Sequence, residues 1–178
     1  SQSEKEDDKR YYLEKEIDNY ITSVYRKILY TEYELELYRK VESGEHLTRE
    51  FLESTYEKLI KTYYGDGIIY DPEISLEWMR LGHQIRWTFY SYRYATGLLI
   101  AATVYAKIVS GELPQERYLE FLASGSKENS LDLLKILDID FSKDDILENG
   151  FKVLEEDLTL VSEYVPTPLA EDKKEMRI

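Results

Sequence analysis

The fold is decided by one stretch near the middle of the chain, Phe89-Tyr90-Ser91-Tyr92-Arg93-Tyr94-Ala95-Thr96-Gly97-Leu98-Leu99-Ile100-Ala101-Ala102-Thr103-Val104-Tyr105-Ala106. From about residue 86 to residue 110, apolar side chains fall on nearly every side of a helix with 3.6 residues per turn. A helix that is apolar all round is normally buried among other helices. The sequence therefore predicts a central helix over about residues 86–110 that forms the core of the fold.

A long amphipathic helix is predicted before this core. Between Lys9 and Val41, apolar residues recur at intervals of three and four, with Glu, Lys and Arg between them. Ser43-Gly44 should end this helix, and Thr48 is a suitable N-cap for the next one, which runs to about Tyr64. Three further helices are expected over residues 114–122, 131–137 and 144–164. The chain thus reads as an all-α, multi-helix bundle.

The predicted domain organisation is one helical portion, residues 1–165, followed by a charged tail, residues 166–178. A chain of 178 residues is long enough for one domain with a substantial core. Pro166 and Pro168 should end the last helix, and we expect the tail beyond them to be mobile. Because the first residue is not Met and the opening stretch reads like the middle of a polar helix, we expect the chain to be a piece of a longer protein.

Composition argues against several classes of partner. The chain has 36 acidic and 23 basic residues and a net charge of −13, and no basic stripe exists to bind a nucleic acid or an anionic membrane. The longest apolar run, residues 94–106, is shorter than the roughly 20 residues of a membrane span. There is no cysteine and no signal peptide at the amino terminus, so a reducing compartment, the cytoplasm, is the predicted location.

No metal site can be built from the two histidines, His46 and His83. Neither belongs to a His-Glu-x-x-His motif, and no Glu-x-x-His pair of the kind found in carboxylate di-iron bundles occurs. His46 lies in a predicted loop, where a solvated histidine is expected. Nucleophilic catalysis is not indicated either, because there is no cysteine and no Gly-x-Ser-x-Gly elbow. We predict no metal ligand in this chain.

Three tyrosines, Tyr90, Tyr92 and Tyr94, alternate at the start of the central segment, and His83 precedes them. Phenols are large hydrogen-bond donors, so this cluster could bind a polar chain or stabilise a developing oxyanion. In a helix, Tyr90 and Tyr94 would share a face and Tyr92 would point about 200° away from Tyr90. From periodicity alone, ordinary aromatic packing is the simpler interpretation, because 17 tyrosines are spread through the chain.

A family resemblance favours the functional interpretation. Residues 78–97 resemble the tyrosine-rich segment of oligoendopeptidase F, a branch of the thimet-oligopeptidase-like zinc metallopeptidases, which has a Trp, then a His, then Phe-Tyr-x-Tyr-x-Tyr-Ala-Thr-Gly. Residues 25–34 are similar to the family's Phe-Arg-Gln-x-x-Phe-Ala-Glu-Phe-Glu, and residues 63–65 to its Tyr-Tyr-Gly. Residues 118–126 and 133–140 resemble its Tyr-Leu-x-Phe-Leu-x-Ser-Gly-Gly-Ser and Leu-Leu-Lys-x-x-Gly-Val-Asp. These matches follow one another in the family's order over most of the chain.

The resemblance implies a mostly helical fold with a channel for short peptides and an oligopeptide-cleaving zinc metalloendopeptidase as the parent protein. In that family the His-Glu-x-x-His helix and the later glutamate ligand precede the portion represented here. The resemblance thus implies zinc in the parent, no cofactor in this chain, and an isolated chain without peptidase activity. By the same resemblance, Tyr92 is the catalytic oxyanion donor, and His83, Tyr90 and Tyr94 contact the substrate.

Two other interpretations stay open. The chain could be a stand-alone, non-enzymatic helical interaction module that kept the fold without the zinc half, or an unrelated tyrosine-rich bundle. As the carboxy-terminal part of a peptidase, its expected partners are the missing amino-terminal portion and short peptide substrates. Such a piece should also expose an apolar or aromatic patch, and a dimer burying Tyr90, Tyr92 or Trp87 would not be physiological.

Overall fold

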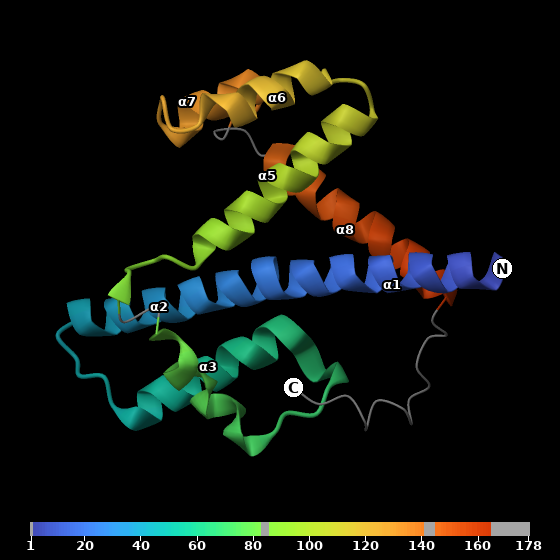
Figure 1. The fold of residues 1–178 in the computed structure, drawn as a ribbon. Coiled ribbons are helices and arrows are strands. Elements are labelled where there is room, and N and C mark those ends of the chain that lie inside the picture. Colours follow the sequence, from blue (N-terminus) through green and yellow to red (C-terminus); the bar gives the residue numbers. More distant parts are fainter. Residues whose placement is uncertain (1, 83–85, 141–144, 165–178) are drawn as a thin grey trace. The chain divides into compact units, whose positions relative to one another are not determined.

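A computed structural model describes residues 2–82, 86–140 and 145–164. These residues form helices and the connections between them, with no strand, which confirms the all-α prediction (Figure 1). None of the described helices combines the length and the apolar composition that crossing a membrane requires. His83 and the tail that was predicted to be mobile, residues 166–178, lie outside the described residues.

The predicted long helix is present as one continuous helical run from residue 2 to residue 42. It consists of α1 (Gln2–Tyr20), a π-helical segment (Ile21–Tyr25) and α2 (Arg26–Glu42). Within it, the Thr22 hydroxyl donates to the carbonyl oxygen of Asp18 at 2.8 Å, a side-chain bond that competes with the backbone ladder. The run ends as predicted at Ser43-Gly44, where Gly44 has a positive φ of 83°.

The described chain forms two compact units. Of the described residues, the first contains 2–17, 96–140 and 145–161, and the second contains 18–82, 86–95 and 162–164. The long helical run and the central helix each contribute residues to both units. The predicted domain boundary at residue 165 remains a prediction, because residues after 164 are outside the described part of the chain.

The second unit is built from α2, α3 (Arg49–Tyr64) and a 3-10 helix, Pro72–Arg80, that packs on α3. Thr48 caps α3 as predicted, since its side-chain oxygen accepts the Phe51 N–H at 3.2 Å. The core between α2 and α3 includes Tyr33 and Tyr56, whose rings meet edge to face with centroids 5.2 Å apart. This core gives α2 a fixed partner, and α2 in turn carries Glu34, which binds the loop before α5.

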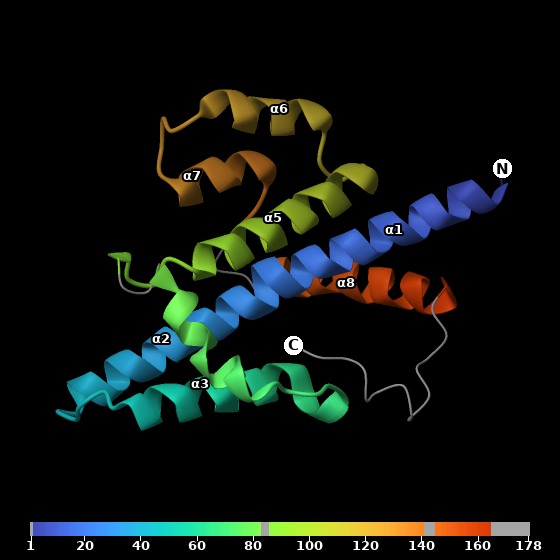
Figure 2. The same cartoon turned by 60° about the horizontal axis from the view of Figure 1, so that its bottom comes forward.

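The first unit is arranged around the central helix. Its helices are α5 (Tyr92–Val109), α6 (Gln115–Ser124), α7 (Ser130–Leu134) and α8 (Asp145–Tyr164). α6 and α7 lie over one side of α5, whereas α8 packs on another side (Figure 2). Asn129 caps α7, because its side-chain oxygen accepts the Asp132 N–H at 3.0 Å.

The central helix begins later than the sequence pattern indicates. We predicted a start near residue 86, but α5 starts at Tyr92. Phe89 has a positive φ of 49°, which interrupts a helix, and the Tyr90 N–H donates to the carbonyl oxygen of Trp87 in a tight turn. Residues such as Leu99 and Thr103 are buried, but Tyr105 on the same helix exposes 62% of its surface. Within the described residues, the apolar run is therefore covered only in part.

Candidate functional site

Three of the four predicted site residues are described, and all three belong to the second unit. Tyr92 and Tyr94 lie in the first turn of α5, and Tyr90 lies in the loop just before it. Tyr92 and Tyr94 expose 44% and 45% of their surfaces, and Tyr90 is half-buried. His83, the fourth predicted residue, is outside the described residues, so its role stays a prediction.

The predicted pairing of Tyr90 with Tyr94 is found, although Tyr90 is not in the helix. Their ring centroids lie 5.7 Å apart at an interplanar angle of 71°. A hydrogen bond with Tyr90 raises the pKa of Tyr94 above its ordinary value. The ring centroids of Trp87 and Tyr90 lie 5.6 Å apart, and Cζ of Arg93 lies 5.2 Å from the Tyr90 centroid. Trp87, Tyr90 and Tyr94 thus form one aromatic cluster around the Tyr90 ring.

A buried glutamate on α2 holds the loop that carries this cluster. Glu34 exposes only 2% of its surface, and its Oε1 accepts the Phe89 N–H at 2.7 Å. The Phe89 ring stacks on Tyr38 of α2 at a centroid distance of 5.3 Å, and the Tyr38 and Thr88 hydroxyls lie 3.2 Å apart. Burial raises the pKa of Glu34, and the Phe89 N–H partly opposes that rise. These contacts fix the turn at Phe89 and with it the position of the tyrosines.

A second polar cluster joins α2, α3 and the 3-10 helix. The Arg26 guanidinium pairs with Oε1 of Glu77, whose Oε2 accepts the Tyr56 hydroxyl at 2.8 Å. Arg26 also donates to the Tyr30 hydroxyl at 3.1 Å. The Arg26 and Glu77 side chains are only 23% and 13% exposed, so the pair lies largely out of water. Burial and the bond to Glu77 raise the pKa of Tyr56.

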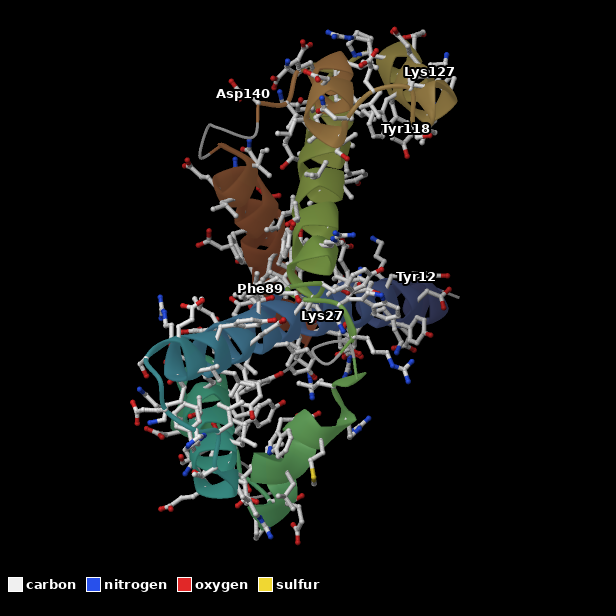
Figure 3. All side chains as sticks on the ribbon, turned by 90° about the vertical axis from the view of Figure 1, so that its left-hand side faces the viewer. Tyr12, Lys27, Phe89, Tyr118, Lys127 and Asp140 are labelled. Carbon is white, nitrogen blue, oxygen red and sulfur yellow. The ribbon has the colours of Figure 1, made fainter. Side chains whose placement is uncertain are left out.

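Lys27 connects this polar cluster with the tyrosines. Its ammonium lies 5.1 Å from the ring centroid of Tyr94 and 5.4 Å from that of Tyr30, on the side of α2 that meets the start of α5 (Figure 3). Burial, together with repulsion from Arg26, lowers the pKa of Lys27. It also lines a cavity of about 370 Å³ in the second unit, which it shares with Arg26, Glu77 and Arg80.

Sequence reasoning missed Glu34 and Lys27. Glu34 carried a usable signal, because it follows Tyr33 and lies four residues after Tyr30, on the face of α2 that the apolar pattern assigns to the core. A carboxylate at such a position needs a partner. Lys27 carried no comparable signal, since its aromatic contact is with Tyr94, far away in the sequence.

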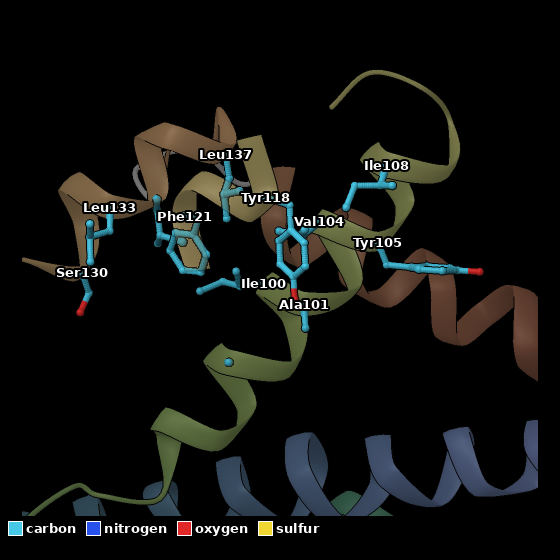
Figure 4. A pocket seen from close by; sticks show the side chains of 12 residues that line it. Ile100, Ala101, Val104, Tyr105, Ile108, Tyr118, Phe121, Ser130, Leu133 and Leu137 are labelled. Atoms are coloured by element: carbon cyan, nitrogen blue, oxygen red, sulfur yellow. The ribbon is translucent and has the colours of Figure 1, made fainter. Parts of the chain in front are cut away.

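An apolar groove is found in the first unit, separate from the tyrosine cluster. It has a volume of about 540 Å³ and lies between α5, α6 and α7 (Figure 4). Ile100 and Val104 of α5 face Phe121 of α6 and Leu133 of α7 across it. Apart from the hydroxyl groups of Tyr105, Tyr118 and Ser130 its lining is apolar, and such a surface can contact another apolar segment.

The described residues do not fit a zinc ion. They contain no group of three or more His, Cys, Asp or Glu side chains that could hold a metal. His46 is exposed in the loop after α2, as predicted for a solvated histidine. The described site offers phenols, which can donate hydrogen bonds, and nearby cationic side chains, which can bind an anion.

Comparison with known proteins gives consistent matches over most of the chain. The model of peptidase family M3 matches residues 1–153. Over 163 residues the chain is 34% identical to the oligopeptidase PepF of Bacillus subtilis, which covers 90% of this chain and 24% of that protein. It is 33% identical over 150 residues to a chromosomal oligoendopeptidase F of Lactococcus lactis subsp. cremoris, and this match covers 84% of this chain and 25% of that protein.

A solved structure shares the fold. The crystal structure of oligoendopeptidase-F from Enterococcus faecium superposes with a TM-score of 0.77 and 29% identity, over 86% of this chain and 30% of that chain. The chain thus spans about a quarter of the length of the relatives it matches.

Proposed function

Because the chain belongs to peptidase family M3, we propose that it forms the carboxy-terminal helical portion of a zinc metalloendopeptidase that cleaves oligopeptides. The observation that carries this proposal is the match over residues 1–153, within which the tyrosine cluster and its anchoring glutamate lie. The names of the relatives, oligopeptidase and oligoendopeptidase, support the substrate class. The lack of cysteine agrees with a cytoplasmic location.

In this proposal the tyrosines act on the peptide. Tyr92 donates its hydroxyl to the oxygen that becomes negative as the peptide carbonyl is attacked, and Tyr90, Tyr94 and His83 contact the substrate. A phenol that stays protonated at neutral pH can stabilise such an oxygen without any proton transfer. The raised pKa of Tyr94 and the fixed loop before α5 support these roles.

Zinc belongs to the parent protein in this proposal, and its ligands lie outside this chain. When bound there, the metal would supply a Lewis acid and an activated water. Since the described residues do not form a metal site, we assign them no step that involves the ion. Their contribution is to bind the peptide and to stabilise charge.

The test is a peptidase assay of the parent protein with a fluorescence-quenched oligopeptide. Replacing Tyr92→Phe removes one oxyanion donor and should lower kcat by about 10²–10³, with little change in KM. Tyr105→Phe is the matched control, because Tyr105 is also an exposed tyrosine of α5. An unchanged kcat in the Tyr92→Phe variant would remove Tyr92 from the mechanism.

The same assay on this chain alone, with zinc added, should show no cleavage. Robust cleavage by the chain would contradict the proposal. The coding sequence upstream separates the proposal from a stand-alone interaction module. A His-Glu-x-x-His motif in the same reading frame supports the peptidase portion, whereas a start codon near Ser1 supports the module.

A further inference from the structure

The cavity beside Lys27 has a charge opposite to that of the chain. Three of its lining side chains are cationic, Arg26, Lys27 and Arg80, and one is acidic, Glu77. The chain as a whole has 36 acidic and 23 basic residues, so a cavity with three cations and one anion runs against its composition. At about 370 Å³ the cavity is large enough for a small polar group.

Glu77 does not neutralise these three cations. Its two carboxylate oxygens already accept from Arg26 and from the Tyr56 hydroxyl, and Arg80 lies 3.8 Å from Oε1. Only 13% of its side chain is exposed. Two positive charges therefore remain in the cavity after the pair of Arg26 with Glu77 is counted.

Lys27 is the cation with the least compensation. Among the described residues no carboxylate lies within ion-pair distance of its ammonium, which instead faces the rings of Tyr30 and Tyr94. Aromatic faces replace only part of the hydration that a partly buried ammonium loses. The lowered pKa of Lys27 agrees with this incomplete compensation for lost hydration. An anionic ligand would supply what the protein does not.

We propose that this cavity binds the free carboxylate at the carboxy-terminal end of a peptide, with Lys27 and Arg80 as its charged partners. This inference rests on the proposed function, because that proposal identifies a peptide as the ligand. Lys27 contacts both the cavity and Tyr94, so a peptide that lies against Tyr94 can reach the cavity with its end. An Asp or Glu side chain offers the same carboxylate chemistry, and the test distinguishes the two sources.

The binding test uses this chain and three acetylated peptides of identical length, measured by isothermal titration calorimetry. One ends in a free carboxylate, one in a carboxamide, and one in a carboxamide after a Glu residue. We expect the first to bind at least about tenfold more tightly than either amide, since each tenfold corresponds to about 1.4 kcal/mol. Equal affinity of acid and amide, or no binding of any peptide, overturns the inference. Tight binding of the Glu amide overturns the assignment to the peptide end.

Two variants test the named partners. Lys27→Met and Arg80→Gln should each reduce the preference for the acid to less than about threefold. The Arg80 side chain is 82% exposed, so Arg80→Gln should not disturb packing. It therefore keeps the test valid even if Lys27→Met impairs folding. Lys58→Met, which removes an exposed positive charge from α3, should leave the preference unchanged. A preference that survives both cavity variants overturns the inference.

An assay of the parent protein separates this inference from the proposed function. If the parent cleaves the acid and the amide forms of one oligopeptide with equal kcat/KM, the peptidase proposal stands and the carboxylate site falls. If it cleaves neither form, the peptidase proposal falls, and the calorimetric comparison still decides whether the cavity selects a carboxylate.

Discussion

At the scale of single residues, Glu34 is the side chain on which the geometry of the tyrosine cluster depends. It is buried on α2, and its Oε1 is the acceptor for the N–H of Phe89, a residue with a positive φ. A non-glycine residue in that conformation costs about 1–3 kcal/mol and persists only where the surroundings enforce it. The hydrogen bond to Glu34 and the stacking on Tyr38 are the enforcing contacts.

Replacing Glu34→Ala should therefore destabilise the chain by about 1–3 kcal/mol, because it leaves the Phe89 N–H without its acceptor. Glu34→Gln keeps a carbonyl oxygen that can accept from the Phe89 N–H, and it removes a carboxyl group whose pKa is raised by burial. The change in unfolding free energy should therefore stay within about 1 kcal/mol. Urea unfolding followed by circular dichroism measures both. Equal losses in the two variants would show that the hydrogen bond is not what matters.

Asp157 on α8 gives the clearest pH dependence. Burial raises its pKa to about 6 from 3.8, and the charges of Glu16 and Glu156 add to the rise. The folded state therefore holds this proton more tightly than the unfolded state. The contribution of Asp157 to stability is most favourable below about pH 4 and is lost as the pH rises through about 6.

Asp157→Asn should thus stabilise the chain by about 1–3 kcal/mol near neutral pH and change little at about pH 4, since an amide cannot acquire the buried charge. Urea unfolding at the two pH values measures the difference. Glu155→Gln, at an exposed position of the same helix, should have a small effect at both. A gain from Asp157→Asn that is equal at the two pH values would rule out the titration of Asp157 as its cause.

At the scale of elements, the close approach of α8 to α5 occurs at Gly150. A Cβ added there would lie 2.6 Å from Cδ2 of Leu99 and 3.3 Å from its Cα. The Cδ2 atom could rotate away, but the Cα could not move without shifting α5 itself. Glycine is therefore required at this crossing, even though it is a poor residue for the middle of a helix.

We expect Gly150→Ala to destabilise the chain by about 1–2 kcal/mol, because overpacking outweighs the gain of about 1 kcal/mol in helix propensity. Gly97→Ala is the matched control on α5, where an added Cβ meets nothing within 4 Å. That variant should gain up to about 1 kcal/mol. Thermal unfolding of the two variants side by side provides the measurement, and a stabilised Gly150→Ala would mean that the helices can separate without cost.

The elements were largely predictable because their ends are set by local chemistry. Thr48 and Asn129 cap their helices through bonds to backbone N–H groups three residues ahead, and Gly44 ends the long helical run. The start of α5 was not predictable in this way. Its turn at Phe89 depends on Glu34, which is distant in the sequence, and no periodicity reports such a contact. The predicted pairing of Tyr90 with Tyr94 is confirmed, but the prediction that both residues lie in one helix is wrong, because Tyr90 lies in the loop before α5.

At the scale of the whole molecule, the chain spans about a quarter of the length of its relatives. The tyrosines and their family context could be recognised from sequence. The cavity beside Lys27 could not, because its lining comes from α2 and from a 3-10 helix that the chain pattern does not bring together. The apolar groove on the first unit likewise arises only when α5, α6 and α7 are assembled.

This groove leads to a prediction about self-association. An exposed apolar groove of about 540 Å³, rimmed by Tyr105 at 62% exposure, favours burial against another apolar surface. The isolated chain should therefore associate as its concentration rises from low to high micromolar, as measured by sedimentation velocity. Tyr105→Lys should weaken this association, because it puts a charge at the rim that burial would have to desolvate. Tyr12→Lys changes a tyrosine of 70% exposure that does not line the groove, so it should leave the association unchanged. A chain that stays monomeric at every concentration would contradict this prediction. If both variants weakened the association equally, the groove would not be the associating surface. Trp87, which exposes 55% of its surface, would then be the next residue to replace.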